Sequence, residues 1–386
     1  TFFEHKRAPR SPLRPSLARF PRVAIIVPCY NEEKSLAGTV SSLLALAYPK
    51  DKLEIIVVDD GSTDNTLSVT RSFADSRVRV ITKENGGKHT ALNAGLAATG
   101  AEIVGCLDAD SFVAPDALID MAAQFEAEDV MAVTPGIKAH NPRTLIQLIQ
   151  KVEYEMAIFL RKMFGLLNAQ YVTPGPFSLY RREVFAKVGT FKQGYNTEDM
   201  EMALRIRANH FRIENMHTAH VHTITPATFS ALYRQRLRWV SGFLNNVLRD
   251  YRHLLFSIKH GHLGLFSLPG ALLSIAMVLY LVGYTVFSLA TKIAEKYIEM
   301  SNVNFEILWS TPSVDWFFIN TGSVLLLSII LFSLMAVIVF LGRHLSRERL
   351  RLSRDVISFL LLYGFIAPIW IGMSVYRVAR GKDLKW

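Results

Sequence analysis

The sequence predicts an α/β domain with a mostly parallel sheet, followed by C-terminal transmembrane helices. Two observations support this prediction. Short β-branched runs alternate with helical segments between residues 23 and 107, which is typical of a parallel sheet covered on both faces. Long uncharged stretches then occupy most of the chain after residue 262, and each is long enough to cross the hydrocarbon core of a bilayer.

The alternation begins with the apolar run at 23–27, which is typical of a buried parallel strand. A helix is expected at 31–47. Further elements follow in the order strand, helix, strand, helix, strand, at 53–58, 65–73, 78–81, 88–98 and 102–107. Because ligands bind beyond the carboxyl ends of strands in such sheets, these ends are the first place to look for a site.

The next part of the chain is less regular. Helices are predicted at 145–167, 199–209 and 228–251, and a turn at 174–176 precedes a short strand. The helix at 228–251 combines arginines with aromatic residues. It can be an ordinary amphipathic packing helix or one that lies in a membrane interface, and the sequence leaves both open.

Three runs contain no Asp, Glu, Lys or Arg: 263–291, 316–342 and 356–376. Three such runs in one chain favour membrane spans over buried core helices. Gly364 and Pro368 interrupt the last run, which can therefore be re-entrant or partly interfacial. Thr1-Phe2-Phe3 resembles the end of a membrane helix, so we expect the natural protein to continue upstream.

The formal net charge is +10, and much of the excess flanks the apolar runs, in a basic leader (1–22) and at 343–354. This placement orients membrane proteins and attracts anionic headgroups, so membrane lipids are expected partners and nucleic acid is not. Cys29 and Cys106 are the only cysteines. Both lie in strand-like contexts and are expected to be buried free thiols in a reducing compartment.

Acidic residues follow two predicted strands. Asp108-Ala109-Asp110 places two carboxylates on one side of an extended chain, where they can meet a hard cation and a nucleoside. Asp59-Asp60 precedes Gly61-Ser62, and Gly86-Gly87-Lys88 offers backbone N–H groups and a cation before a helix. Each string also has an ordinary explanation as a turn, a helix cap or a surface loop.

Two further strings lie later in the chain. Glu198-Asp199 opens a predicted helix, where Asp199 can act as a general base or both acids can simply favour the helix dipole. Gln235-Arg236-Leu237-Arg238-Trp239 offers guanidinium groups for phosphate and an indole face for a sugar ring. Snorkelling arginines on an interfacial helix are the alternative.

In this order, the strings resemble those of family-2 inverting membrane glycosyltransferases. The most similar group is the processive synthases of hyaluronan, chitin, cellulose and poly-N-acetylglucosamine. The resemblance runs from about Arg22 to Tyr251. It implies a GT-A nucleotide-sugar-binding fold over 23–227, amphipathic interface helices over 228–262 and a transmembrane region over 263–386. It also implies a UDP-sugar donor and Mg or Mn.

The resemblance also implies roles for individual residues. Asp199 would be the general base, with Glu198 beside it. Asp110 would meet the metal. The nucleotide-sugar would be bound by Pro28, Tyr30, Glu32, Asp60, Lys88 and Asp108. The diphosphate and the acceptor would be bordered by Gly175, Pro176, Gln235, Arg236, Arg238 and Trp239.

The implied function is transfer of a sugar, N-acetylglucosamine being the expected one, to a growing polysaccharide by a multi-pass protein of the plasma membrane with a cytosolic catalytic domain. Membrane assembly partners would fit this role. Transfer of one sugar to a lipid acceptor is the first alternative. A nucleotide-responsive transporter or sensor without catalysis is the second. UDP release and product size separate these three functions.

Overall fold

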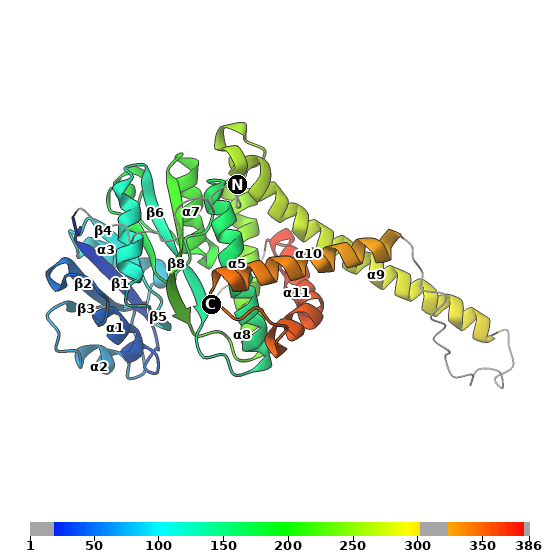
Figure 1. The fold of residues 1–386 in the computed structure, drawn as a ribbon, viewed down its shortest axis with the longest axis horizontal. Coiled ribbons are helices and arrows are strands. Elements are labelled where there is room, and N and C mark those ends of the chain that lie inside the picture. The colour runs from blue at the N-terminus through cyan, green and yellow to red at the C-terminus, as the bar shows by residue number, and fades with distance from the viewer. Residues whose placement is uncertain (1–18, 302–322, 382–386) are drawn as a thin grey trace.

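The computed structural model describes residues 19–301 and 323–381. An eight-stranded sheet lies at one end of the molecule, and apolar helices extend from the other (Figure 1). The strands are β1 (Val23–Cys29), β2 (Leu53–Asp59), β3 (Val78–Thr82), β4 (Ile103–Cys106), β5 (Ser111–Val113), β6 (Val130–Ala139), β7 (Ser178–Arg181) and β8 (Arg212–Thr223).

Helices cover both faces of this sheet and then continue away from it. They are α1 (Leu36–Leu44), α2 (Thr66–Arg71), α3 (Lys88–Ala97), α4 (Ala117–Ala122), α5 (Leu145–Leu166), α6 (Glu183–Val188), α7 (Glu198–Ala208), α8 (Phe229–Asn245), α9 (Leu268–Ser301), α10 (Ser323–Leu345) and α11 (Arg354–Ala379).

The strand order is β3-β2-β1-β4-β7-β6-β8-β5. The first four strands are parallel neighbours, as are β6 and β8. β7 runs antiparallel to both β4 and β6, and β5 runs antiparallel to β8. The predicted mostly parallel sheet is therefore confirmed. The pairing of β4 with β7 brings the chain before Ser178 next to the carboxyl end of β4.

The core has two layers because the side chains of the central strands alternate between the two faces of the sheet. Ile25 and Val27 pack with Leu36 on one face, whereas Ile26 packs with Leu92 of α3 on the other. Every residue of β1 is buried. Burial of an Ile or Leu side chain stabilises a fold by about 1.5–3 kcal/mol, so this strand is a major contributor to stability.

Both cysteines are buried and free, as predicted. Burial, reinforced by the Asp59 carboxylate, raises the pKa of the Cys29 thiol to about 12. Burial likewise raises the pKa of Cys106. Neither thiol is therefore ionised near neutral pH, which fits a structural role in the sheet.

Two predicted helices are shorter in the structure. The helix expected at 31–47 forms only over α1, because Asn31 has a φ of 57° and begins a loop rather than a helix. The helix expected at 228–251 ends at Asn245, and a π-helical turn (Asn246–Asp250) follows. In α5, the Thr144 hydroxyl accepts a hydrogen bond from the backbone N–H of Gln147, whose side chain bonds back to form a capping box.

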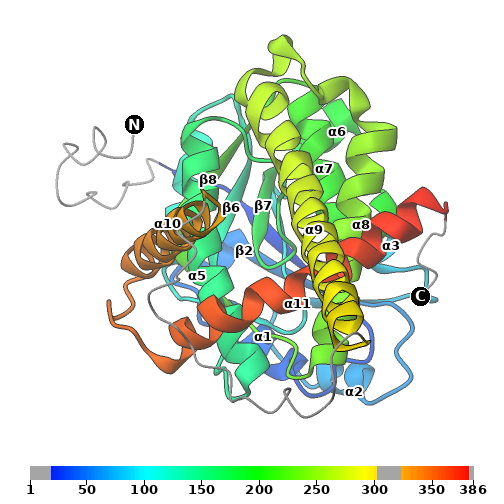
Figure 2. The same cartoon turned by 90° about the vertical axis from the view of Figure 1, so that its right-hand side faces the viewer.

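Two segments, Leu263–Glu295 and Arg354–Ala379, are long and apolar enough to cross a membrane by length and composition. α9 projects well beyond the rest of the described chain (Figure 1), while α11 lies across the domain beside α8 (Figure 2). α11 is continuous through Gly364 and Pro368, so the interruption expected there is not seen. The predicted span at 316–342 begins outside the described residues and continues as α10.

Candidate active site

The acidic strings meet at one edge of the sheet. Glu32 follows β1, Asp60 follows β2 and Asp108 follows β4, and these three strands are parallel neighbours. The carboxyl ends of parallel strands lie at the same edge, so residues far apart in the sequence become neighbours. The prediction that these strings converge at the strand ends is consistent with this topology.

Lys88 connects the strand ends to α7. Its Nζ atom lies 2.6 Å from Oδ1 of Asp108 and 3.0 Å from Oε1 of Glu198. Burial acts to lower the pKa of Lys88, but Asp108, Glu198 and Asp199 together raise it well above its ordinary value. One permanently charged ammonium thus holds the two acidic strings against each other.

A loop before β7 closes over this ion pair. A Cβ atom added at Gly175 would lie 2.6 Å from Oδ2 of Asp108 and 2.7 Å from Nζ of Lys88. A side chain at this position would force the ends of the Asp108 and Lys88 side chains to shift. The loop is fixed further because the Thr173 hydroxyl donates to the backbone oxygen of Asp199 at 2.7 Å and accepts from the phenol of Tyr180 at 2.9 Å.

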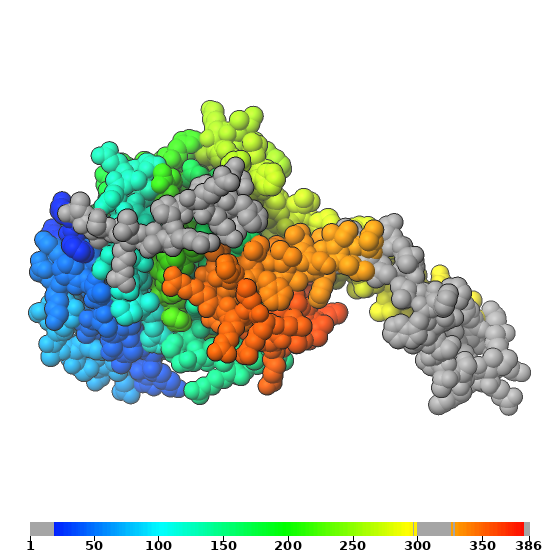
Figure 3. Space-filling view, in the orientation of Figure 1, coloured from blue at the N-terminus to red at the C-terminus, as the bar shows by residue number. Residues whose placement is uncertain are grey.

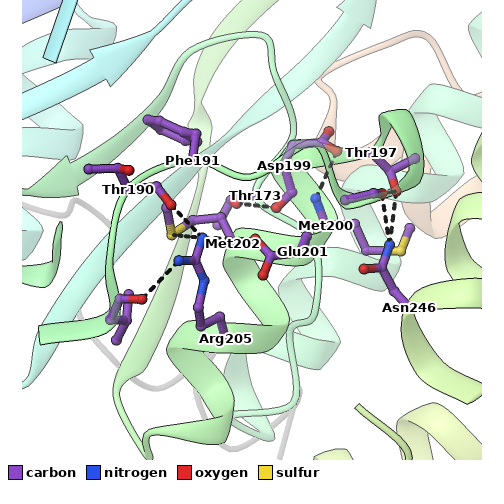
Figure 4. Close-up of polar contacts among 12 residues, drawn as sticks. Thr173, Thr190, Phe191, Thr197, Asp199, Met200, Glu201, Met202, Arg205 and Asn246 are labelled. Atoms are coloured by element: carbon purple, nitrogen blue, oxygen red, sulfur yellow. Dashed lines mark hydrogen bonds and ion pairs between the residues drawn. The ribbon is translucent and has the colours of Figure 1, made fainter. Parts of the chain in front are cut away.

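Asp199 stands at the start of α7 and is half-buried as a residue. Oδ1 accepts a hydrogen bond from the backbone N–H of Met200 at 2.7 Å (Figure 4). Burial and the neighbouring Glu198 raise the pKa of Asp199 to about 6, while Lys88 opposes the rise. A carboxyl with this pKa is largely ionised at neutral pH and is a stronger base than an ordinary aspartate.

Glu198 is held differently from its neighbour. Burial acts to raise its pKa, but Lys88, a backbone hydrogen bond and Arg238 lower it. Glu198 is therefore ionised and paired, and its charge contributes to the raised pKa of Asp199. Two adjacent carboxyls have acquired opposite pKa shifts, which is the pattern expected where one is structural and the other exchanges protons.

Asp110 and Glu32 lie close to other carboxyl groups. Burial, Asp108 and Glu32 raise the pKa of Asp110 to about 7. Its Oδ1 atom accepts hydrogen bonds from Ser111 at 3.0 Å and Thr223 at 3.3 Å. Burial also raises the pKa of Glu32. The hydrogen bond from Ser35 opposes this rise, whereas Asp108 and Asp64 add to it. A cation would relieve this mutual repulsion.

The donor set fits a hard divalent cation only in part. Among residues 19–301 and 323–381, no group of three or more His, Cys, Asp or Glu side chains could hold a metal by itself. Mg²⁺ is commonly bound through one or two carboxylates together with substrate phosphates. Asp110 therefore fits a metal that arrives with, and is completed by, a bound diphosphate.

The Asp60 side chain binds the neighbouring loop. Its carboxylate lies 2.5 Å from Nζ of Lys83 and accepts hydrogen bonds from the N–H groups of Gly86 and Gly87. These contacts set the geometry of the loop that leads into Lys88. Nearby, Pro28 is a buried member of β1, and Tyr30 directly after that strand is 48% exposed.

The two arginines of the Gln235–Trp239 string on α8 have different partners. Arg236 is buried, pairs with Oε2 of Glu153 on α5 at 2.9 Å and lies 4.1 Å from the ring centre of Trp239. Arg238 lies close enough to Glu198 to lower its pKa. Oε1 of Gln235 is buried and has no hydrogen-bond partner in the described structure. The structure thus places Arg238 near Glu198, whereas Arg236 pairs with α5.

α8 also touches the loop that carries Asp199. A Cβ atom added at Gly242 would lie 2.5 Å from the Thr197 side chain. Nδ2 of Asn246 donates to the hydroxyl of Thr197 and to the backbone oxygen of Gly194, at 3.1 Å each (Figure 4). The Thr197-Glu198-Asp199 string is therefore fixed from both sides, by Thr173 and by α8.

Sequence reasoning missed Arg161 and Thr173. Burial lowers the pKa of the Arg161 guanidinium, which lies near the phenol of Tyr154 and the carboxylate of Asp199. Arg161 is part of the predicted helix at 145–167, but an arginine in the middle of an amphipathic helix carries no signal of its own. Only the tertiary structure, which places Arg161 near Asp199, reveals it.

Comparisons with known proteins identify the relatives of this chain. Residues 24–189 match the model of glycosyl transferase family 2. Poly-beta-1,6-N-acetyl-D-glucosamine synthases of Staphylococcus aureus (strain COL) and Staphylococcus epidermidis (strain ATCC 35984) are each 31% identical over 233 residues. These residues cover 59% of this chain and 56% of each synthase. The chain thus spans about half the length of these curated relatives.

The fold has a counterpart among solved structures. A mannosyltransferase of Pyrobaculum calidifontis, solved in complex with GDP-Man and Mn²⁺, gives a TM-score of 0.53 at 24% identity. The match covers 72% of this chain and 81% of that one, and it supports the fold alone. The family match shows that residues 24–189 are similar to glycosyl transferase family 2 domains.

Proposed function

We propose that the protein transfers a sugar, with inversion, from a UDP-sugar to a growing polysaccharide at a membrane. The observation that carries this proposal is the Lys88 bridge, which holds Asp108 at the strand ends beside Glu198 and hence beside Asp199. A donor held at Asp108 would have its anomeric carbon within the same small region as the candidate base.

The reaction follows from this arrangement. The Asp199 carboxylate takes the proton of the acceptor hydroxyl as the acceptor oxygen bonds to the anomeric carbon from the face opposite the diphosphate. The bond between that carbon and the phosphate oxygen breaks, and UDP leaves with the electron pair. Arg238 and Lys88 supply positive charge close to the departing group.

In this proposal Pro28, Tyr30, Glu32 and Asp60 form the nucleoside end of the site. Gly175, Pro176, Gln235 and Trp239 border the acceptor end, and Arg236 acts there through its contact with Trp239. A Mg²⁺ or Mn²⁺ ion at Asp110 would neutralise charge on the leaving diphosphate.

N-acetylglucosamine is the proposed sugar, since the curated relatives are named for poly-N-acetylglucosamine synthesis. The test is UDP release by the purified full chain from a panel of UDP-sugars with Mg²⁺ or Mn²⁺, followed by sizing of the product. We expect release to need the metal and to be highest with UDP-N-acetylglucosamine. Metal-dependent release with only short, lipid-extractable product would instead support single transfer to a lipid, and absence of release would reject enzymatic function.

The pH dependence provides a further prediction. Because the pKa of Asp199 is about 6, the base is protonated and inactive below that value and active above it. We expect the rate of UDP release to fall about tenfold for each pH unit below 6 and to reach a plateau above about pH 7. UDP affinity measured over the same range separates protonation of the base from loss of donor binding. A rate that is constant from about pH 5 to 7.5 would contradict the assignment of the base.

We also propose that the apolar helices span the plasma membrane more than once and keep the catalytic domain in the cytosol, where UDP-sugars are made. Basic residues at 343–354 would then lie inside, as the positive-inside rule requires. Protease access to a tag after Trp386, compared in intact cells and inverted vesicles, tests the side on which the chain ends.

A further inference from the structure

A basic cavity lies away from the candidate active site, where α5 meets the connection between α10 and α11. Its volume is about 450 Å³. The connection covers residues 346–353, between the end of one apolar helix and the start of the next. It lies on the face shown in Figure 3, where its atoms (orange) are at the surface.

The floor of the cavity is a closed network of ion pairs. Nζ of Lys151 on α5 lies 3.1 Å from Oδ2 of Asp355 and 3.5 Å from Oε2 of Glu348. Arg343 is buried and lies 3.0 Å from the same oxygen of Asp355 and 3.5 Å from Oε2 of Glu155. Nζ of Lys138 on β6 lies 3.7 Å from Oε1 of Glu348 and brings the floor to three cations and three carboxylates. Glu348 and Asp355 both line the cavity, and both are already paired.

The rim of the cavity, formed by three exposed arginines, differs from the floor in its charge. Arg349, Arg351 and Arg354 line the cavity and are exposed. Within the described chain, none of their guanidinium groups makes an ion pair or a side-chain hydrogen bond. Three uncompensated guanidinium groups around a cavity form a site for an anion, because each can offer paired N–H donors to phosphate oxygens.

The surroundings favour an anion that is attached to a membrane. Leu350 and Leu352 alternate with the rim arginines and are 58% and 63% exposed. Exposed leucines beside arginines are unfavourable in water but suit the boundary between headgroups and acyl chains. The connection also joins α11, one of the two segments apolar enough to cross a membrane, to the apolar α10.

We propose that this cavity binds the phosphate headgroup of an anionic phospholipid. The three rim arginines hold the phosphate, and the two leucines enter the acyl boundary. Basic pockets between membrane helices on the cytoplasmic side are known to suit such headgroups. The connection and the end of α10 are already held by the domain: Nζ of Lys138 on β6 donates to the backbone oxygen of Ser346 at 2.6 Å, and Gly342 packs against the α5 backbone.

The test uses the purified full chain in neutral detergent. Binding of fluorescent phosphatidylglycerol is measured, and unlabelled phosphatidylglycerol, phosphatidylcholine, inorganic phosphate and UDP are the competitors. The triple variant Arg349→Gln, Arg351→Gln, Arg354→Gln removes the rim. The control removes the same charge from the far end of the sheet domain, with Lys50→Gln, Arg71→Gln and Arg79→Gln (Figure 1).

We expect phosphatidylglycerol to compete far better than phosphatidylcholine, and we expect the rim variant to bind at least about tenfold more weakly than the control. Equal binding by the two variants would overturn the site. Equal competition by phosphatidylcholine would overturn headgroup recognition, and displacement by millimolar phosphate or UDP alone would assign the cavity to a soluble anion instead. Circular dichroism and UDP affinity of the rim variant show whether it is folded, so a loss of lipid binding is attributable to the rim.

Discussion

Replacing Asp199 with asparagine is expected to lower sugar transfer by about two to four orders of magnitude while leaving UDP affinity nearly unchanged. Asparagine keeps the size of the side chain, and its oxygen can still accept the hydrogen bond from the N–H of Met200. It cannot take a proton at neutral pH. Transfer is measured as UDP release from the preferred UDP-sugar, and binding of UDP is measured by calorimetry.

Asp51→Asn is the matched control for this substitution. The side chain of Asp51 is 76% exposed and lies in a turn before β2, on a surface with no part in the proposed site. The control should retain full activity. If Asp199→Asn also retained it, another group would have to accept the proton. If UDP binding fell in parallel with transfer, Asp199 would be needed for donor binding rather than for proton transfer.

Much of the nucleotide-binding half of this fold could be predicted because its signals are local. An apolar run such as Val23–Val27 is stable in water only when both of its faces are buried, as in the middle of a parallel sheet. Acidic residues directly after such a strand must then lie at the edge of the sheet where the strands end. Position relative to a strand end therefore located Asp60 and Asp108, and the order of the motifs linked them to Asp199.

The later part of the sheet was predicted only in part: a short strand was expected after the turn at 174–176, but its pairing was not, because pairing depends on distant segments. β5 has only three residues, and β7 runs against the direction of its neighbours. The sequence contains no signal for either feature. The same limit applies to side-chain partners: Arg236 was expected at the diphosphate, whereas its ion pair is with Glu153, a residue 83 positions away whose role depends on how α5 packs on α8. Whether Arg236 affects phosphate binding stays a prediction.

Replacing Gly175 with alanine is expected to reduce transfer about a hundredfold, the second-largest effect among these predictions. The added methyl would lie 2.6 Å from Oδ2 of Asp108 and 2.7 Å from Nζ of Lys88, well inside van der Waals contact. Either the ion pair or the loop must move, and a shift of about 1 Å at a reacting centre costs roughly this much in rate. The steric cause predicts weaker UDP binding as well, because Asp108 is the proposed nucleotide contact.

Gly100→Ala supplies the comparison that isolates the steric cause. A Cβ atom at Gly100 would meet nothing within 4 Å, so this variant changes the same residue type without disturbing a neighbour. It should keep wild-type transfer and UDP affinity. If both alanine variants were fully active, the 173–177 loop could not lie against Asp108 and Lys88 in the working protein. The close approach at Gly175 and the ion pair between Lys88 and Asp108 involve the same atoms. The Lys88 ion pairs, on which the proposed function depends, would then have a different geometry in the working protein.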